Sequence, residues 1–150
     1  MQTQVDILMV EDKPEDHILT VFALLNAESN KIHVVRDGEE ALSYIFCENA
    51  YADRNVEDQP RMILLDRNLR MVSGLEVLRR IREDPRTQSI PVVMLSASER
   101  ESDLAEAYRL GVNSYVVKPT DSSEFKQAVR MIAAYWLHLN RSSSMGVGAN

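Results

Sequence analysis

Residues 5–12 read VDILMVED, a short apolar run that stops at two acids. Runs of this length and composition favour a strand buried on both faces of a parallel sheet. Three later runs stop at a polar residue in the same way: Met62–Leu65 at Asp66, Val92–Leu95 at Ser96, and Tyr115–Val117 at Lys118. Parallel strands deliver their carboxyl ends to one edge of the sheet, where ligands bind. The sequence therefore predicts one cluster made of Glu11, Asp12, Asp66, Ser96 and Lys118.

Strand and helix patterns alternate five times along the chain. A second strand is expected at Ile32–Val35, and the helix after the first strand carries Glu15 and Asp16 in its first turn, where acids complement the helix dipole. Five such units joined by right-handed crossovers form an α/β doubly wound three-layer sandwich. Its five-stranded parallel sheet is expected to have the order 2-1-3-4-5, with the switch point between strands 1 and 3. That order places the first two acids beside Asp66.

Capping and breaker residues predict where the later helices begin and end. Asp121 with Glu124 three residues later is typical of a capping box that opens the last helix. Gly111 predicts the end of the preceding helix, whose inward positions are expected to be Leu104, Ala105 and Tyr108. Ser and Gly residues near the C-terminus predict a flexible tail. The expected division is a single domain over residues 1–140 and a tail over 141–150.

Composition limits the classes of function. A length of 150 residues suffices for one domain, and the single cysteine, Cys47, excludes an internal disulfide framework. The formal net charge of −6 argues against a nucleic-acid groove, which needs a basic surface. No apolar run approaches the ~20 residues of a membrane span, and the first residues lack the pattern of a signal peptide. We therefore expect a cytoplasmic protein without nucleic-acid or membrane partners.

Three carboxylates at one edge predict a divalent cation. Mg²⁺ suits them because it takes carboxylate oxygens, keeps several waters and shares phosphate oxygens. Zn²⁺ prefers Cys and His, and none of the three histidines lies at an expected strand end. With Mg²⁺ present, the carboxylate of Asp66 can attack a phosphorus atom, while Lys118 and Ser96 hold charge on the phosphoryl oxygens. The predicted product is an acyl phosphate on Asp66.

Each of these residues taken singly also suits a helix cap, a turn or a solvent-facing position. Their joint occurrence, in order, at the ends of strands 1, 3, 4 and 5 favours a single site. The segments that carry them resemble the receiver domains of response regulators: ILMVED at 7–12, ILLDRNL at 63–69, VVMLSA at 92–97 and YVVKP at 115–119. The resemblance extends from Val5 to Leu139. It implies a flavodoxin-like fold and phosphorylation of Asp66 by a histidine kinase.

The same resemblance implies a role for each matching position. Asp12 would bind Mg²⁺ directly, Glu11 through water, and Asn68 through its backbone carbonyl. Ser96 and Tyr115 would form the switch pair, in which Ser96 is drawn to the phosphoryl oxygen and Tyr115 follows inward. A domain of this kind accepts phosphate on its own aspartate and turns over no separate substrate, so we do not expect an enzyme.

Two arginines depart from the pattern of the family. Receiver domains usually carry an apolar residue at the position of Arg67 and a proline at that of Arg70. These guanidiniums are either exposed loop charges or close enough to Asp66 to alter kinase docking or phosphate lifetime. The Tyr135-Trp136 pair and the long loop Glu48–Arg61 are similar to the single-domain regulators that serve phytochrome-type kinases, so the expected partner is a histidine kinase of that type.

The last helix carries more apolar residues than one buried face requires. Its inward stripe is expected to be Phe125, Val129, Ile132 and Trp136. Four further apolar residues lie outside this stripe: Met131, Tyr135, Leu137 and Leu139. No output domain follows this helix, so we expect a stand-alone receiver and a homodimer through these four side chains. Scattered exposed apolar residues on a monomer are the alternative.

Two other classes of function share part of the pattern. A phosphohydrolase with an aspartyl-phosphate intermediate would need a second acid two residues beyond the nucleophile, where this chain has Asn68. A binding module that never accepts phosphate would keep its acids as caps, and the joint presence of Asp12, Asp66, Ser96 and Lys118 argues against it. The prediction is therefore a phosphoryl-accepting signalling switch that acts through the surface of helix 4, strand 5 and helix 5.

Overall fold

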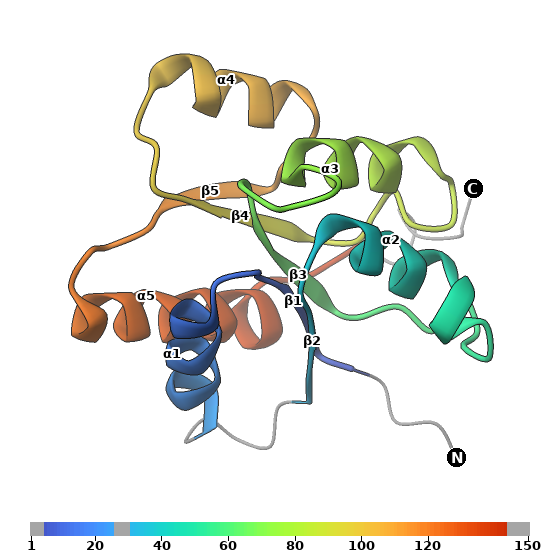
Figure 1. Cartoon of the computed structure of the whole chain (residues 1–150), viewed down its shortest axis with the longest axis horizontal. Coiled ribbons are helices and arrows are strands. Elements are labelled where there is room, and N and C mark those ends of the chain that lie inside the picture. The colour runs from blue at the N-terminus through green and yellow to red at the C-terminus, as the bar shows by residue number, and fades with distance from the viewer. Residues whose placement is uncertain (1–4, 26–30, 144–150) are drawn as a thin grey trace.

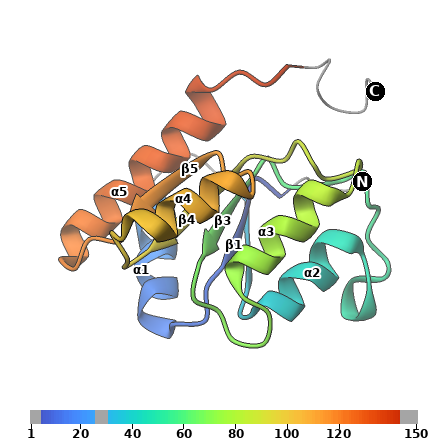
Figure 2. The same ribbon diagram turned by 90° about the horizontal axis from the view of Figure 1, so that it is seen from above.

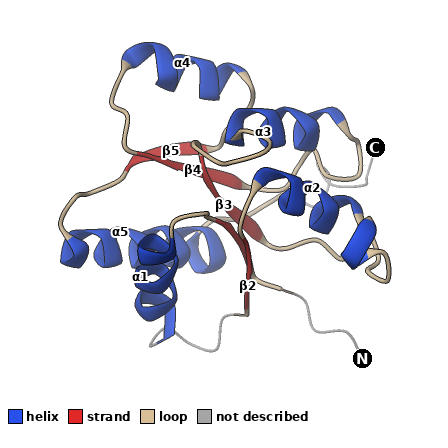
Figure 3. Ribbon diagram, viewed as in Figure 1, coloured by secondary structure: helices blue, strands red, loops and turns tan. Residues whose placement is uncertain are grey.

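The computed structural model describes residues 5–25 and 31–143 of the chain, in which strands and helices alternate (Figure 3). The strands are β1 (Ile7–Val10), β2 (Ile32–Val35), β3 (Met62–Asp66), β4 (Val92–Ser96) and β5 (Ser114–Val117). The helices are α1 (Pro14–Leu25), α2 (Gly38–Phe46), α3 (Gly74–Glu83), α4 (Glu101–Arg109) and α5 (Ser122–Ala134), and a single π turn, Tyr135–Leu139, continues α5. Within the described residues, no helix is long and apolar enough to cross a bilayer. Residues 144–150 of the expected tail lie outside the described part.

The sheet is parallel and has the order β2-β1-β3-β4-β5, which confirms the predicted topology. Ile7 of β1 pairs with Ile32 on one side and with Met62 on the other, so the central strands run in step. All residues of β1, β3 and β4 are buried, as expected of strands covered on both faces. Because the strands share one direction, the residues after β1, β3 and β5 meet at one edge.

Helices cover both faces of the sheet (Figure 1). One core lies between the sheet and α2, α3 and α4, and the other lies between the sheet and α1 and α5. Seen from above, α2 and α3 lie side by side on one flank and α5 lies on the other (Figure 2). This is the predicted three-layer sandwich, and burial of its two apolar cores is the main source of its stability.

Helix α4 departs from its predicted packing. Of its nine residues, all of which the structure describes, only Ala107 is buried. Ala105 and Tyr108, which were expected to face inward, are exposed, and Leu104 is half-buried. Helix α4 lies beside the edge strand β5 rather than over the middle of the sheet, so it buries little more than the small side chain of Ala107. Gly111 ends this segment with a φ of +102°, which confirms the predicted stop.

The prediction for Leu137 was wrong. The backbone N–H of Asn140 donates to the carbonyl of Tyr135 at 2.6 Å, a hydrogen bond across five residues that marks the π turn. Leu137 lies four residues after the buried Ala133, is only 4 % exposed and joins the core, and the partly buried Trp136 packs against the same core. The other three members of the predicted dimer face are exposed: Met131, Tyr135 and Leu139.

Candidate functional site

Three carboxylates gather where β1 and β3 end. Glu11 and Asp12 follow β1 and Asp66 closes β3, and one oxygen from each lies within 4.8 Å of the other two. Glu11 and Asp66 are buried, whereas Asp12 is half-buried. All three donors are hard oxygens at distances that one cation can share, so the residues fit Mg²⁺. The predicted cluster of acids is thus present in the fold.

Lys118, directly after β5, brings an ammonium into this cluster. Its Nζ lies 2.9 Å from Asp66 Oδ2 and 3.2 Å from Glu11 Oε1, and it also lies 2.9 Å from Asp16 Oδ2. The Lys118 side chain is 9 % exposed, so these ion pairs are largely removed from water. Burial by itself lowers the pKa of Lys118, but the three carboxylates outweigh burial and raise that pKa above its usual value.

Glu11 holds the proton that this crowding requires. Burial, together with the hydrogen bond and the charge of Asp66, raises the pKa of Glu11 to about 8, although Lys118 lowers that pKa in part. Without a metal ion, this raised pKa favours the neutral form of Glu11 at pH 7. A cation among these oxygens would take the place of that proton.

Backbone amides orient the other carboxylate oxygens. Asp66 Oδ1 accepts from the N–H of Asn68 at 3.0 Å, and Asp12 Oδ2 accepts from the N–H of Arg70 at 3.2 Å. The guanidinium Nε of Arg70 lies 3.7 Å from the same Asp12 oxygen, although 72 % of the Arg70 side chain is exposed. The loop after β3 thus orients two acids through its backbone and places an exposed guanidinium beside Asp12.

The predicted switch pair is linked through a residue that the sequence analysis did not identify. Ser96 is fully buried, and its Oγ accepts from the N–H of Ser98 at 3.1 Å. The hydroxyl of Tyr115 donates to the carbonyl of Ser98 at 3.0 Å. Ser98 therefore links Ser96 to Tyr115, and a shift of the loop after β4 would change the hydrogen bonds of both side chains.

Arg67 is not an exposed loop charge. Its side chain is 19 % exposed and reaches α4, where Nη2 lies 3.2 Å from Asp103 Oδ1 and 3.6 Å from Glu106 Oε1. The Ser98 hydroxyl also donates to Asp103. This hydrogen bond and the charge of Arg67 hold the pKa of Asp103 below its usual range. Of the two unusual arginines, Arg67 is thus directed toward α4 and Arg70 toward the acids.

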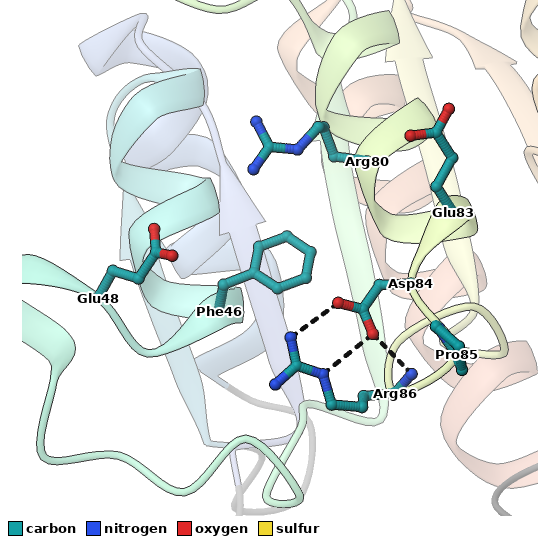
Figure 4. A pocket seen from close by; sticks show the side chains of 7 residues that line it. All are labelled: Phe46, Glu48, Arg80, Glu83, Asp84, Pro85 and Arg86. Atoms are coloured by element: carbon teal, nitrogen blue, oxygen red, sulfur yellow. Dashed lines mark hydrogen bonds and ion pairs between the residues drawn. The ribbon is translucent and has the colours of Figure 1, made fainter.

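A hollow of about 330 Å³ lies elsewhere, between the ends of α2 and α3 (Figure 4). Phe46 and Arg80 line one part of it, and Asp84 in the same hollow is paired with Arg86 at 2.8 Å. None of the predicted site residues lines this hollow. The three acids and Lys118 lie instead where β1, β3 and β5 end.

Comparison with known proteins decides the family. Residues 7–130 match the response regulator receiver domain. The chain belongs to this family. It is the receiver domain of a two-component response regulator, a signalling domain, and the flavodoxin-like fold agrees with this assignment. The phosphohydrolase and the phosphate-free binding module are correspondingly less well supported.

Several regulators resemble this receiver domain over most of their length. The probable methanogenesis regulatory protein FilR2 of Methanothrix harundinacea is 39 % identical over 137 residues, which cover 91 % of this chain and 86 % of FilR2. Response regulator Rcp1 of Synechocystis is 33 % identical over 132 residues, covering 87 % and 88 %. Phosphorylated cyanobacterial phytochrome response regulator RcpA gives a TM-score of 0.86 at 38 % identity, covering 93 % and 98 %. The Mn²⁺-bound form of Rcp1 also gives 0.86, at 31 % identity, covering 95 % and 100 %.

Asp16 and Ser98 are the polar residues of this receiver domain that the sequence analysis did not assign to the site. Asp16 was explained by the helix dipole, and that explanation also holds, because it lies in the first turn of α1. Its contact with Lys118 joins residues 102 positions apart, so the spacing of residues within α1 gave no signal of it. Ser98 gave no signal of its own, because its contacts run through the backbone and through α4.

Proposed function

We propose that the carboxylate of Asp66 accepts a phosphoryl group from the phosphohistidine of a histidine kinase in the cytoplasm. The observation that carries the proposal is the buried Asp66 carboxylate, 2.9 Å from the Lys118 ammonium and beside two further acids. The receiver unit is residues 1–140, with residues 141–150 as a tail. Conversion between two states of this unit, rather than turnover of a separate substrate, is its activity.

In the transfer, an oxygen of Asp66 forms a bond to phosphorus while the bond from phosphorus to the histidine nitrogen breaks. The electron pair of that bond stays on the histidine nitrogen, and the product is an acyl phosphate. Lys118 and the hydroxyl of Ser96 compensate charge on the phosphoryl oxygens. Glu11, Asp12, Asp66 and the carbonyl of Asn68 would hold Mg²⁺, which supplies charge that screens the anionic nucleophile from the anionic donor.

The test is a mass measurement after incubation with acetyl phosphate and Mg²⁺. Wild-type protein is expected to gain one phosphoryl group, and Asp66→Asn is expected to gain none. Asp53→Asn is the matched control, because Asp53 is an exposed acid of the loop before β3 and should leave the gain unchanged. A gain in Asp66→Asn equal to that of wild type, mapped to another residue, would contradict the assignment.

The donor proposed for this chain is a histidine kinase of the phytochrome type. The 38 % identity to a cyanobacterial phytochrome response regulator over nearly the whole of both chains supports it. Phosphotransfer from an autophosphorylated phytochrome-type kinase should be faster than transfer from a kinase of an unrelated pair at equal concentration. Equal rates from both donors would contradict this part of the proposal and leave Asp66 as the acceptor.

The output proposed for this receiver is the surface of α4, β5 and α5. Few residues separate the site from this surface. The N–H of Lys118 donates to the carbonyl of Ser96 at 2.8 Å, and Tyr115 lies in β5, the strand that Lys118 follows. A homodimer through α5 and its π turn would use Met131, Tyr135 and Leu139, which are 65 %, 47 % and 70 % exposed. These three side chains support association because water does not favour a cluster of large exposed apolar groups.

A further inference from the structure

The backbone of Arg67 is fixed beside the proposed acceptor. Its N–H donates to the carbonyl of Leu95 at 3.0 Å, and its carbonyl accepts from the N–H of Gly74, also at 3.0 Å. Gly74 permits this approach, because a Cβ there would lie 2.3 Å from the carbonyl oxygen of Asp66 and 2.8 Å from the Cα of Arg67. Arg67 therefore starts from a rigid point, and only its side chain is free to move.

That side chain crosses to α4 and pairs with two acids one turn apart. Nη2 lies 3.2 Å from Asp103 Oδ1 and 3.6 Å from Glu106 Oε1. The side chains of Arg67 and Asp103 are 19 % and 18 % exposed, so their attraction is screened less than that of a surface pair. The charged contact thus joins the end of β3 directly to the first half of α4.

Asp103 carries the connection onward to the switch residues. It accepts from the hydroxyl of Ser98, whose N–H donates to Ser96 Oγ and whose carbonyl accepts from the hydroxyl of Tyr115. Ser98, in the loop after β4, is therefore bound to Asp103 of α4, to the buried Ser96 and to Tyr115, and its Oγ also accepts from the N–H of Arg100 at 3.2 Å. If Asp103 moves away from Arg67, its hydrogen bond with Ser98 is disturbed, and with it the loop that contacts Ser96 and Tyr115.

Little else holds this half of α4. Ala107 is the one buried side chain among the nine residues of the helix, all of which are described. The residue that precedes the helix, Arg100, makes no capping hydrogen bond with its side chain. A helix with so small an apolar contact is among the elements that move most readily, so a single ion pair can decide its position.

We propose that Arg67 is a positioning residue that holds α4 and the loop after β4 in their unphosphorylated arrangement, and that phosphorylation of Asp66 loosens this hold. This inference rests on the proposed function, in which Asp66 carries the phosphoryl group. The acyl phosphate carries close to two negative charges where the carboxylate carried one, and this added charge, one residue from Arg67, attracts the guanidinium and repels Asp103. The Arg67–Asp103 contact then weakens, and the loop that contains Ser98 is released.

The test is hydrogen–deuterium exchange of residues 98–110 without a phosphodonor. Arg67→Met keeps the apolar stem and removes the charge, and it should speed exchange in this segment about fivefold. Asp103→Asn should have the same effect, and it provides an independent test if Arg67→Met does not fold. Arg70→Met, which removes the other guanidinium, should match wild type, and Arg67→Lys should restore slow exchange to within about twofold. Wild-type exchange in both Arg67→Met and Asp103→Asn would overturn the proposal.

A second measurement separates a positioning role from general stabilisation. After acetyl phosphate and Mg²⁺, exchange of the same segment in wild type should rise, whereas Arg67→Met should already be fast and should show no further rise. Equal increments in the two proteins would contradict the loosening by phosphorylation. Mass measurement on the same samples reports whether Asp66 is phosphorylated, so failure of the acceptor assignment is distinguished from failure of the Arg67 inference.

Discussion

Lys118 places one ammonium among the carboxylates of Glu11, Asp16 and Asp66. Burial and the neighbouring Asp66 carboxylate raise the pKa of Glu11 to about 8, because the single charge of Lys118 only partly offsets them. The site is therefore short of positive charge when no metal ion is bound. The first two predictions, on Glu11 and on Lys118, follow from this shortage of positive charge.

The first prediction concerns pH and Mg²⁺. Below pH 8 the folded protein holds a proton on Glu11 that Mg²⁺ must displace, so the affinity for Mg²⁺ should rise between pH 6 and 8 by up to about tenfold per pH unit. The same proton is absent from the unfolded chain above about pH 4.5, so the stability of the metal-free protein should fall over the window from 4.5 to 8. Titration calorimetry at several pH values measures the affinity.

Glu11→Gln is the control for that prediction. It removes the titrating group and keeps the shape of the side chain, so the affinity for Mg²⁺ should become nearly independent of pH in this range. A slope in Glu11→Gln equal to that of wild type would assign the proton to another group.

The second prediction concerns Lys118→Met. Loss of the ammonium leaves buried carboxylates without compensation, which should lower the free energy of unfolding by about 2–4 kcal/mol in the absence of Mg²⁺. Addition of Mg²⁺ should recover more stability in this variant than in wild type, because the cation replaces the missing charge. Urea unfolding with and without Mg²⁺ measures both effects, and Lys13→Met, at an exposed lysine near the site, serves as control. Equal losses in the two variants would contradict this role for Lys118.

Helix α5 illustrates how a single turn decides which side chains are available to a partner. Its buried residues Phe125, Val129 and Ala133 recur every four positions, and the π turn extends the series to Leu137. Leu139, only two residues farther along, is 70 % exposed. Two leucines in one turn therefore lie in different environments: Leu137 is in the core and Leu139 is on the surface.

The third prediction uses this pair of leucines. Leu137→Ala should lower the free energy of unfolding by about 2–4 kcal/mol, because it removes apolar contacts from the core between the sheet and α5. Leu139→Ala should change it by no more than about 0.5 kcal/mol, because its side chain contacts water. Thermal or urea unfolding of the two variants gives the comparison directly. A larger loss of stability in Leu139→Ala than in Leu137→Ala would show that Leu139, rather than Leu137, faces the core.

The molecule as a whole presents two separate regions. The acids and Lys118 lie at the edge where the strands end, and the exposed side chains Met131, Tyr135 and Leu139 lie on α5 and its last turn. A dimer through the second region would leave the first open to a kinase. Phosphorylation could then act on the dimer through α4 and β5, which contact one another.

The fourth prediction is that the chain self-associates through this region. Burial of a large apolar side chain contributes roughly 1.5–3 kcal/mol, so three on each partner can offset the cost of association. Sedimentation should show a dimer for wild type at tens of micromolar and a monomer for Tyr135→Lys and Leu139→Glu, an effect of about tenfold or more on the dissociation constant. Met71→Lys is the control, because Met71 is 71 % exposed but lies in the loop after β3. A wild-type monomer, phosphorylated or not, would rule out the dimer.

The sequence by itself determined the order of the sheet and the composition of its active edge. Each strand is a short apolar run with a polar stop, and both features depend only on neighbouring residues. Right-handed crossovers then bring Glu11, Asp12, Asp66 and Lys118 to one edge whatever the details of packing. The caps at Asp121 and Gly111 were predictable for the same reason, because a cap is a local structure.

Only the tertiary structure decided which side chains meet across elements. Asp16 reaches Lys118 over 102 residues, and Arg67 reaches Asp103 over 36, so neither pair shares a local pattern. Leu137 lies inward because the side of α5 that meets the sheet contains Ala133, four residues earlier, and the apolar pattern alone did not show which of several apolar positions forms that side. The physical reason is common to all three cases. The spacing of residues in the sequence predicts which side of a helix or strand a residue lies on. The contact that its side chain makes depends on the distance and angle at which a second element packs against that side.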